Sequence, residues 1–479
     1  MSASLVRAPK SRIVNPWGWL MIPCFGVLIG GTVVALGPLY AAIVLSAGIG
    51  ALSLWWMNTL VPILSIKRLT VPAAFYWMYF LRVYLPAHVI LLENRGPSQW
   101  TYMIGVDSTL LLIPLGMTAA QIVLRRGRRA SLRFFAAHTW PPMRSKTTRL
   151  WIYGLGIVSL AVVAIHVSLL PSIPIISLLQ NPGQSSLIAA MREDSFKMLA
   201  VPGGLKYLMS WTQSVFLPLL VLLCLTEYRI TRKGRWLVLL AGSFALEMFY
   251  SSLTLAKGPV AGFLLILVLF YWLWFDVKLT PRRLILAFGL VLAFPFLVNF
   301  VSYGKQMAVG DILTTINGLA RRLLYVTADM PYHYFDLFPL RGEFLGGRTI
   351  GLLSSLMGWE YFNTSRFVYS IIVPGGLQTG YANSVFIGDL YADFGMQGVL
   401  VGSFLVGGLL QTLQAILERY PRNSLLLGVY VIVCVNVMDL VSMSLTISLM
   451  TGGLILALVL LFADRCLHSL LISRPTGPS

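Results

Sequence analysis

The sequence has little charge for its length. Asp, Glu, Lys and Arg together make up 11% of its 479 residues, whereas soluble domains contain about 25%. Hydrophobic residues make up 57%, and the mean hydropathy is +0.79. This composition excludes a soluble globular protein, and it predicts an all-α, polytopic membrane protein with one integral membrane domain over residues 1–479.

The sequence also lacks the residue spacings of disulfide, metal and hydrolase sites. No C-x-x-C pair occurs, so neither a disulfide nor a zinc site is expected. No G-x-S-x-G occurs, and Gly388-Asp389 lacks the first glycine of a G-x-G-D pattern, which argues against intramembrane proteolysis. The loops predicted below to face outward contain no Asp-x-Asp motif, no His cluster and none of the four cysteines, so no metal or cofactor is predicted. The cysteines are Cys24, Cys224, Cys434 and Cys466.

Long apolar runs recur along the whole chain. A helix of ~17–25 apolar residues crosses a hydrocarbon core of ~30 Å. By this measure the sequence predicts about twelve transmembrane helices. They cover roughly residues 17–37, 39–57, 71–92, 101–124, 150–170, 211–227, 236–254, 259–275, 284–302, 396–417, 424–441 and 445–463.

The basic residues between these runs predict the orientation, because Lys and Arg accumulate in short cytoplasmic loops. They fall in alternate loops, above all in the basic segment 125–149, which we interpret as a cytoplasmic loop that touches anionic lipid. Both termini are then cytoplasmic, residues 17–37 form a first span rather than a signal peptide, and loops 171–210 and 303–384 face outward. This topology accounts for most of the net charge of +19, so no nucleic-acid partner is expected.

The interval 301–395, between the ninth and tenth predicted spans, is the long polar stretch of this apolar chain. Basic groups, carboxylates and aromatic rings together are typical of a surface that binds anions and sugars, so this interval is the predicted site. Its basic residues are Lys305, Arg321, Arg322, Arg341, Arg348 and Arg366, and its carboxylates are Asp311, Asp329, Asp336, Glu343, Glu360, Asp389 and Asp393.

Two helices are predicted within this interval. Apolar residues at helical spacing predict an amphipathic helix over 311–328, with Arg322 and Asp329 on its polar side. A second helix from near Ser384 to Leu417 would be ~50 Å long, more than the membrane core requires, so a bend is expected at Gly395 and Gly398. Its Asp389 and Asp393 are four residues apart and need cationic partners or a protonated member.

Other charged residues are candidates outside this interval. Arg192 falls on a predicted helix over 185–199, where it either binds an anion or pairs with a neighbouring carboxylate. Lys257 precedes Pro259 at a predicted helix start, which suits a small anion site or a snorkelling lysine. Arg82 and His88 interrupt the third span, and ionisable groups within a membrane are functional candidates.

The sequence resembles the Wzy-type oligosaccharide repeat-unit (O-antigen) polymerases. The resemblance covers roughly residues 180–415 and rests on several segments together. They are an arginine-bearing loop followed by GGLKYL, AKGP at an outer turn, ARRLLYVTADMPYHYFD and FLGGRTIG after the ninth span, and NSVFIGDLYADFGMQGVLVGSFLVGG leading into the tenth.

This resemblance implies a GT-C-like, metal-independent glycosyltransferase of the bacterial cytoplasmic (inner) membrane, with undecaprenyl-pyrophosphate-linked glycans as donor and acceptor. A chain-length regulator is a further expected partner. Cations would stabilise the leaving pyrophosphate, and a carboxylate or histidine would act as the base. The expected cations are Arg192, Lys257, Arg322, Arg341 and Arg348; the base candidates are Asp393, Asp329, Asp389, Glu343 and His333; the expected glycan contacts are Tyr325, Tyr332, Tyr334 and Tyr391.

Two other functions remain open from the sequence. An O-antigen ligase would use the same lipid donor, arginines and topology. A lipid-linked glycan flippase or another transporter would also suit twelve spans, although carriers built from two similar halves should contain matching segments, and none is evident. A processive synthase would need a cytoplasmic nucleotide-sugar domain, for which no loop is large enough.

Overall fold

A computed structural model describes most of the chain, and every element in the described part is a helix. The statements below concern these residues. They are 37–63, 69–125, 128–136, 140, 145–170, 173, 176–177, 201–253, 257–275, 280, 282–283, 285–286, 289, 309–339, 343–374 and 380–472.

The order of helices follows the predicted apolar runs. Helices below are α-helical unless marked, and three segments, η1, η2 and η3, are π-helical. The elements are α2 (Pro38–Leu60), α3 (Val71–Tyr79), η1 (Phe80–Tyr84), α4 (Leu85–Leu92), α5 (Ser98–Leu124), α6 (Arg128–Ala136), α7 (Ser145–Leu169), α10 (Gly203–Trp211), η2 (Thr212–Phe216), α11 (Leu217–Thr231), α12 (Gly234–Ser252), α13 (Lys257–Phe275), α15 (Val309–Ala320), η3 (Arg321–Tyr325), α16 (Val326–Leu337), α17 (Gly351–Met357), α18 (Thr364–Ile372), α19 (Val385–Leu417), α20 (Ser424–Met438), the 3-10 turn η4 (Asp439–Val441), α21 (Leu445–Met450) and α22 (Leu454–Ile472).

Within the described residues, nine helices are long and apolar enough to cross a membrane, which makes the chain a multi-pass membrane protein. They confirm nine of the twelve predicted spans. Span 236–254 corresponds to α12, which is a helix but falls outside this set because Arg235 and Glu247 make it less apolar. Span 17–37 lies outside the described residues except at its last residue, as does most of span 284–302.

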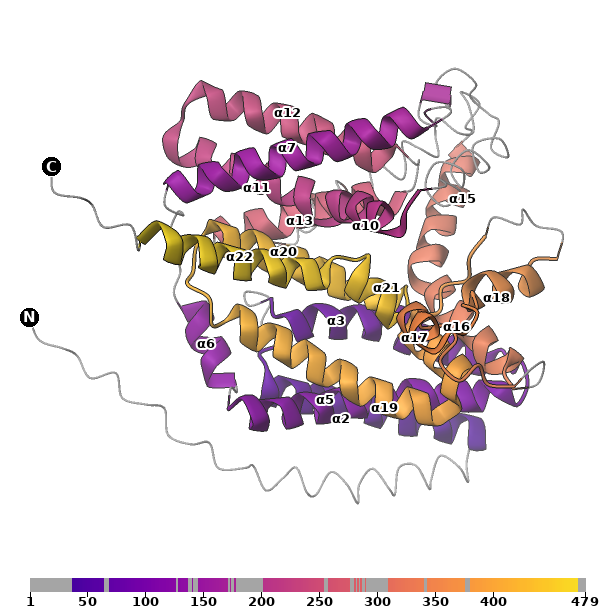
Figure 1. Ribbon diagram of the computed structural model, residues 1–479. Helices are drawn as coiled ribbons and strands as arrows, with labels where there is room; N and C mark the ends of the chain where they lie inside the picture. The colour runs from indigo at the N-terminus through magenta and orange to yellow at the C-terminus, as the bar shows by residue number, and fades with distance from the viewer. Residues whose placement is uncertain are drawn as a thin grey trace, which may run out of the picture.

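The spans form a bundle with α20 and α22 between two groups of helices (Figure 1). One group contains α7, α11, α12 and α13, and the other contains α2, α3, α5 and α19. Helices α5 and α19 approach most closely at two glycines. A Cβ atom on Gly116 would lie 1.9 Å from the Phe404 carbonyl oxygen, and one on Gly407 would lie 2.1 Å from that of Ile113. Such small residues allow the close backbone packing common in membrane bundles.

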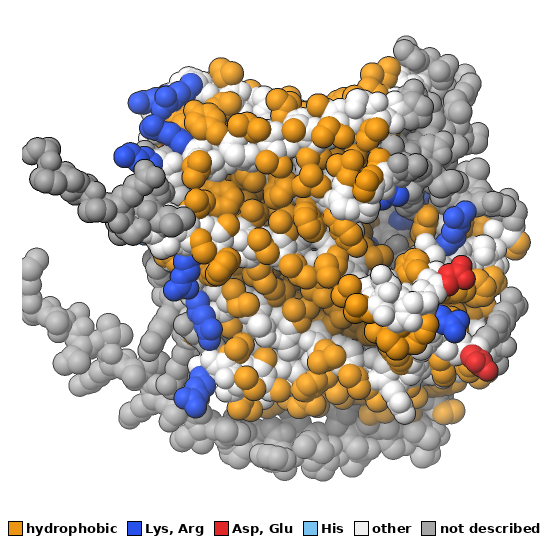
Figure 2. All heavy atoms as spheres, in the orientation of Figure 1, with side chains coloured by type: hydrophobic (Ala, Val, Ile, Leu, Met, Phe, Trp, Pro, Cys, Tyr) orange, Lys and Arg blue, Asp and Glu red, His pale blue; other side chains and the backbone are white. Residues whose placement is uncertain are grey.

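The two ends of the bundle differ in charge. Helices α15, α16, α17 and α18 gather at one end, and the C-terminal end of α22 lies at the other (Figure 1). Figure 2 shows Lys and Arg side chains along the α22 end, whereas the α15–α18 end carries both signs of charge. In the same view the surface is hollowed between α10 and α17, with Lys or Arg side chains inside the hollow.

The predicted outward loops contain regular structure. Residues 303–384 include the π-helical segment η3 and all four helices of this end, and residues 203–210 of the predicted loop 171–210 belong to α10. In the basic segment 125–149, residues Arg128–Ala136 form α6 and α7 begins at Ser145.

Candidate functional site

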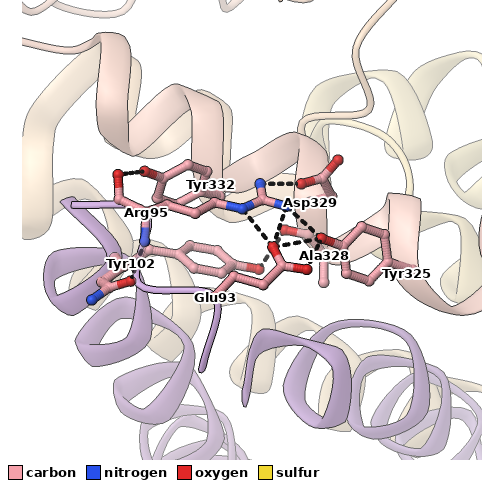
Figure 3. Close-up of polar contacts among 8 residues, drawn as sticks. Glu93, Arg95, Tyr102, Tyr325, Ala328, Asp329 and Tyr332 are labelled. Atoms are coloured by element: carbon pink, nitrogen blue, oxygen red, sulfur yellow. Dashed lines mark hydrogen bonds and ion pairs between the residues drawn. The ribbon is translucent and has the colours of Figure 1, made fainter. Parts of the chain in front are cut away.

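Arg95 is the centre of a charged cluster that joins the α4–α5 connection to α16 (Figure 3). Its Nη1 donates to Asp329 Oδ1 at 2.5 Å, and its Nε donates to Glu93 Oε2 at 2.6 Å. Its Nη2 donates to the Tyr325 hydroxyl, which in turn donates to Glu93 at 2.9 Å. Each of the three guanidinium nitrogens therefore has a partner, and the side chain is only 26% exposed.

Aromatic rings complete this cluster. The Arg95 guanidinium carbon lies 5.5 Å from the ring centroid of Tyr332 and 6.0 Å from that of Tyr325. Burial lowers the pKa of Arg95, but the hydrogen bond and charge of Asp329, with Glu93, outweigh that effect and raise it. Burial and the hydrogen bond to Glu93 raise the pKa of Tyr325 to about 12. Both shifts strengthen the protonation states that arginine and tyrosine already have near neutral pH.

Sequence reasoning missed Arg95 and Glu93. The pattern ENRGPS could have suggested them, because it falls in a loop predicted to face outward together with 303–384. The same reasoning placed Asp329 on one helix face with Arg322; in the structure Asp329 pairs with Arg95. Arg322 belongs to the π-helical segment η3, which interrupts the regular helix before Asp329. One additional residue in a helical turn rotates every later side chain by ~100°.

A second π-helical segment packs against η3. Arg82, in η1, donates from Nε to the Leu323 carbonyl and from Nη2 to Thr327 Oγ1, both at 2.9 Å. The third predicted span is therefore joined to the polar end through Arg82. Short π-helical turns of this kind are frequent at functional sites.

Asp393 holds a turn that contains Arg348. Its carboxylate accepts hydrogen bonds from the backbone N–H of Gly347 at 3.1 Å, from that of Thr349 at 3.3 Å, and from the Thr349 hydroxyl. The side chain is buried. Asp393 is thus anchored by neutral donors, and it forms no ion pair with any residue that the structure describes.

The predicted bend of α19 is confirmed at Gly395, where φ is 62° and ψ is −153°. A bend at this point deprives the Ala392 and Asp393 carbonyls of their helical partners. The backbone N–H groups of Leu345 and Gly346 occupy them, each at 2.9 Å. The bend and the segment that leads to Arg348 therefore support one another.

Asp389 lies at the start of α19 with two hydroxyl partners. It accepts hydrogen bonds from Thr364 Oγ1 and Ser384 Oγ, both at 2.7 Å. Like Asp393, it is buried and forms no ion pair among the described residues. Of the two alternatives predicted for this pair, a cationic partner or a protonated member, the first is not found among the described residues, where hydroxyl and backbone groups are the donors.

The other predicted residues differ in accessibility. Arg322, Arg348 and Glu343 are exposed, and within the described residues their side chains have no hydrogen-bond or ion-pair partner. His333 is half-buried beside Tyr332, with a ring centroid distance of 5.3 Å. Burial lowers the pKa of His333, and the charge of Asp329 partly opposes that shift. A neutral imidazole can accept a proton.

The predicted tyrosines belong mainly to the packing of this end. Tyr334 is fully buried, and its hydroxyl donates to the Ala382 carbonyl at 3.0 Å. Tyr391 is buried and stacks on Phe335 with centroids 4.0 Å apart. Tyr332 is buried beside Arg95, and Tyr325 is half-buried in the charged cluster. Among the four, Tyr325 is the most accessible.

Three predicted cations lack a described side chain. Arg192 and Arg341 lie outside the described residues, and so does the predicted helix 185–199. Lys257 is the first residue of α13, which confirms the helix start predicted from the AKGP pattern. Its side chain is not among those that the structure describes. In the described part of the chain, no group of three or more His, Cys, Asp or Glu residues could hold a metal ion.

Comparisons with protein-family models, with curated proteins and with solved structures found no match for this chain.

Proposed function

We propose that the protein polymerises undecaprenyl-pyrophosphate-linked oligosaccharide repeat units. In this reaction the growing glycan leaves its lipid pyrophosphate and is transferred to a hydroxyl of a new lipid-linked unit. The proposed location is the bacterial cytoplasmic membrane, with the α15–α18 end facing outward and both termini in the cytoplasm. The basic side chains at the α22 end agree with this orientation, since Lys and Arg accumulate in cytoplasmic loops.

The observation that carries the proposal is the presence of exposed arginines without partners at the polar end of an apolar bundle. Arg322 and Arg348 come from different elements, and neither is neutralised by a described residue. A leaving pyrophosphate needs positive charge as its own negative charge develops, and a guanidinium group binds two phosphate oxygens at once. Arg192, Lys257 and Arg341 complete the proposed cation set.

The acceptor hydroxyl needs a base close to these cations. Asp393 remains our first candidate, and its contacts add a second role, because it orients the turn that contains Arg348. Asp389, one helical turn away, offers a matched comparison. Three further base candidates remain. They are Asp329, which is paired with Arg95, Glu343, which is exposed, and His333, which is neutral near pH 7.

The lipid-linked glycans of a deletion strain test this function. If the protein is a polymerase, the mature surface lipid of this strain should still carry a single repeat unit but no polymer. Loss of all glycan from the surface lipid would indicate a ligase. Accumulation of lipid-linked units on the cytoplasmic side would indicate a flippase. Either of these last two results would overturn the proposal.

A further inference from the structure

Helix α17 exposes most of its large apolar side chains and buries Ser354. Ser354 is 1% exposed, and its hydroxyl donates to the Arg348 carbonyl at 3.0 Å. Leu352 is 57% exposed and Leu356 76% exposed, and Met357 is also exposed. Ser355 is also exposed, so α17 presents three large apolar side chains and one hydroxyl to its surroundings. A short helix that exposes this much apolar surface and buries a serine is typical of a surface that contacts lipid.

Two exposed aromatic residues follow α17, on either side of the exposed Glu360. Gly358 ends the helix with a φ of 67°, and Trp359 and Tyr361 are exposed directly after it. Trp and Tyr are enriched where a membrane meets water, because the rings are apolar and carry a polar group. Figure 2 shows hydrophobic side chains both over the α19 surface and in the α17 region, with backbone and other side chains among them.

The part of α19 that follows its bend has the length of a hydrocarbon core. Residues 396–417, after the bend, span roughly 33 Å at ~1.5 Å per residue, which matches a hydrocarbon core of ~30 Å. Phe394, next to the bend, is exposed. A Cβ atom on Gly347 would lie 3.3 Å from the Phe394 ring and 2.6 Å from Leu353 of α17. The start of α17 therefore packs beside the point where α19 leaves the hydrocarbon.

We propose that α17, together with Trp359 and Tyr361, docks into the headgroup region of the leaflet at this end. The occupant of the exposed face is phospholipid. A second protein chain is the rival occupant, but the start of α17 packs beside the exposed Phe394 of α19, and Trp359 and Tyr361 are of the types enriched where a membrane meets water.

This docking would determine how deep Arg348 lies relative to the membrane. Arg348 precedes α17, and its carbonyl is bound to Ser354, so the depth of α17 determines the depth of Arg348. Its guanidinium group then lies level with the lipid phosphates, where the pyrophosphate of a lipid-linked substrate also lies. This last step rests on the proposed function, whereas the docking itself does not.

Spin labelling of the full chain tests the docking without any measurement of activity. A nitroxide on Leu356→Cys is compared with one on Leu405→Cys, an exposed residue of α19, and one on Asn317→Cys, an exposed polar residue of α15. Cys224 and Cys434 are buried and can stay, whereas Cys24→Ser and Cys466→Ser remove the other two thiols. The protein is studied in vesicles of phosphatidylethanolamine and phosphatidylglycerol.

The expected result is that the Leu356 label collides with oxygen, which dissolves in hydrocarbon, and is shielded from a water-soluble nickel chelate, as the Leu405 label is. Collision with the chelate to the extent seen at Asn317 would place α17 in water and overturn the docking. Shielding from both reagents would mean that a protein surface covers α17, which also overturns it.

The consequence for Arg348 has a separate test. Leu356→Asp should lift α17 from the headgroups, so activity should fall on a long-chain lipid donor in vesicles and persist on a water-soluble donor with a short prenyl chain. Equal activity of this variant and the wild type on the long-chain donor would mean that the position of Arg348 does not depend on the docking of α17. If the wild type is inactive on both donors, the proposed function fails, while the spin-label result stands by itself.

Discussion

Arg95 and Arg348 lie at the same end of the bundle in opposite surroundings. Arg95 has a partner on each guanidinium nitrogen, among them two carboxylates. Arg348 is exposed and has no side-chain partner among the described residues, although its backbone is fixed by Ser354 and by the Asp393 turn. A guanidinium group whose three nitrogens all have partners stabilises the fold, whereas one held in place without partners can bind an anionic ligand.

The largest effect on activity is expected from a change at Asp393, which holds the turn that contains Arg348. Asp393→Asn replaces a carboxylate that accepts three hydrogen bonds by an amide with one accepting oxygen. We expect polymerisation to fall by about 10²–10⁴-fold, the usual range for loss of a general base. Polymer synthesis by purified protein, at equal protein level, measures the effect.

Two variants separate the roles of Asp393. Thr349→Val removes one donor to the carboxylate and leaves the acid in place, so a loss equal to that of Asp393→Asn would mean that Asp393 only positions Arg348. Asp389→Asn is the matched control on the same helix. If it abolishes polymerisation while Asp393→Asn stays near wild type, Asp389 is the base.

Arg348→Lys and Arg322→Lys test the free arginines directly. Lysine keeps the charge but loses the paired donors of the guanidinium group, so activity should fall by roughly 10-fold or more, up to the ~10²–10³-fold cost of losing a donor to developing charge. The measurement is polymer length in cells at normal protein level. Full-length polymer from both variants would remove these residues from the cation set.

Arg95→Gln should affect stability more than chemistry. It leaves Asp329 and Glu93 without their cation, and hydrogen bonds to charged groups contribute about 1.5–3 kcal/mol each, less where solvent screens them. Because the cluster is partly exposed, we expect a loss near the lower value, seen as a lower Tm in detergent. Arg348→Gln is the control and should leave Tm unchanged. Equal Tm values for both variants would contradict a structural role for Arg95.

The smallest expected effect is that of metal removal. If arginines neutralise the pyrophosphate, purified protein should retain its activity in EDTA, because no divalent ion is needed to stabilise the leaving group. Loss of activity that Mg²⁺ or Mn²⁺ restores would mean that carboxylates of this end are metal ligands, and the assignment of a base among them would be wrong.

Local patterns in the sequence predicted nine of the spans and the bend of α19. Hydropathy predicted nine helices that the structure contains, because a helix that crosses lipid must satisfy its backbone internally and be apolar along its length. The bend at Gly395 was also predictable, since α19 is longer than the membrane is thick and only a glycine readily adopts its positive φ.

Tertiary structure decided which charges meet. Arg95 and Asp329 are 234 residues apart, so no local pattern links them. The π-helical turn η3 changes the phase of the helix before Asp329, which a regular 3.6-residue repeat cannot anticipate. The same holds for Asp393, whose partners come from a turn 44 and 46 residues earlier. Composition determines that this chain lies in a membrane, whereas packing between distant segments determines which of its arginines remain free to bind.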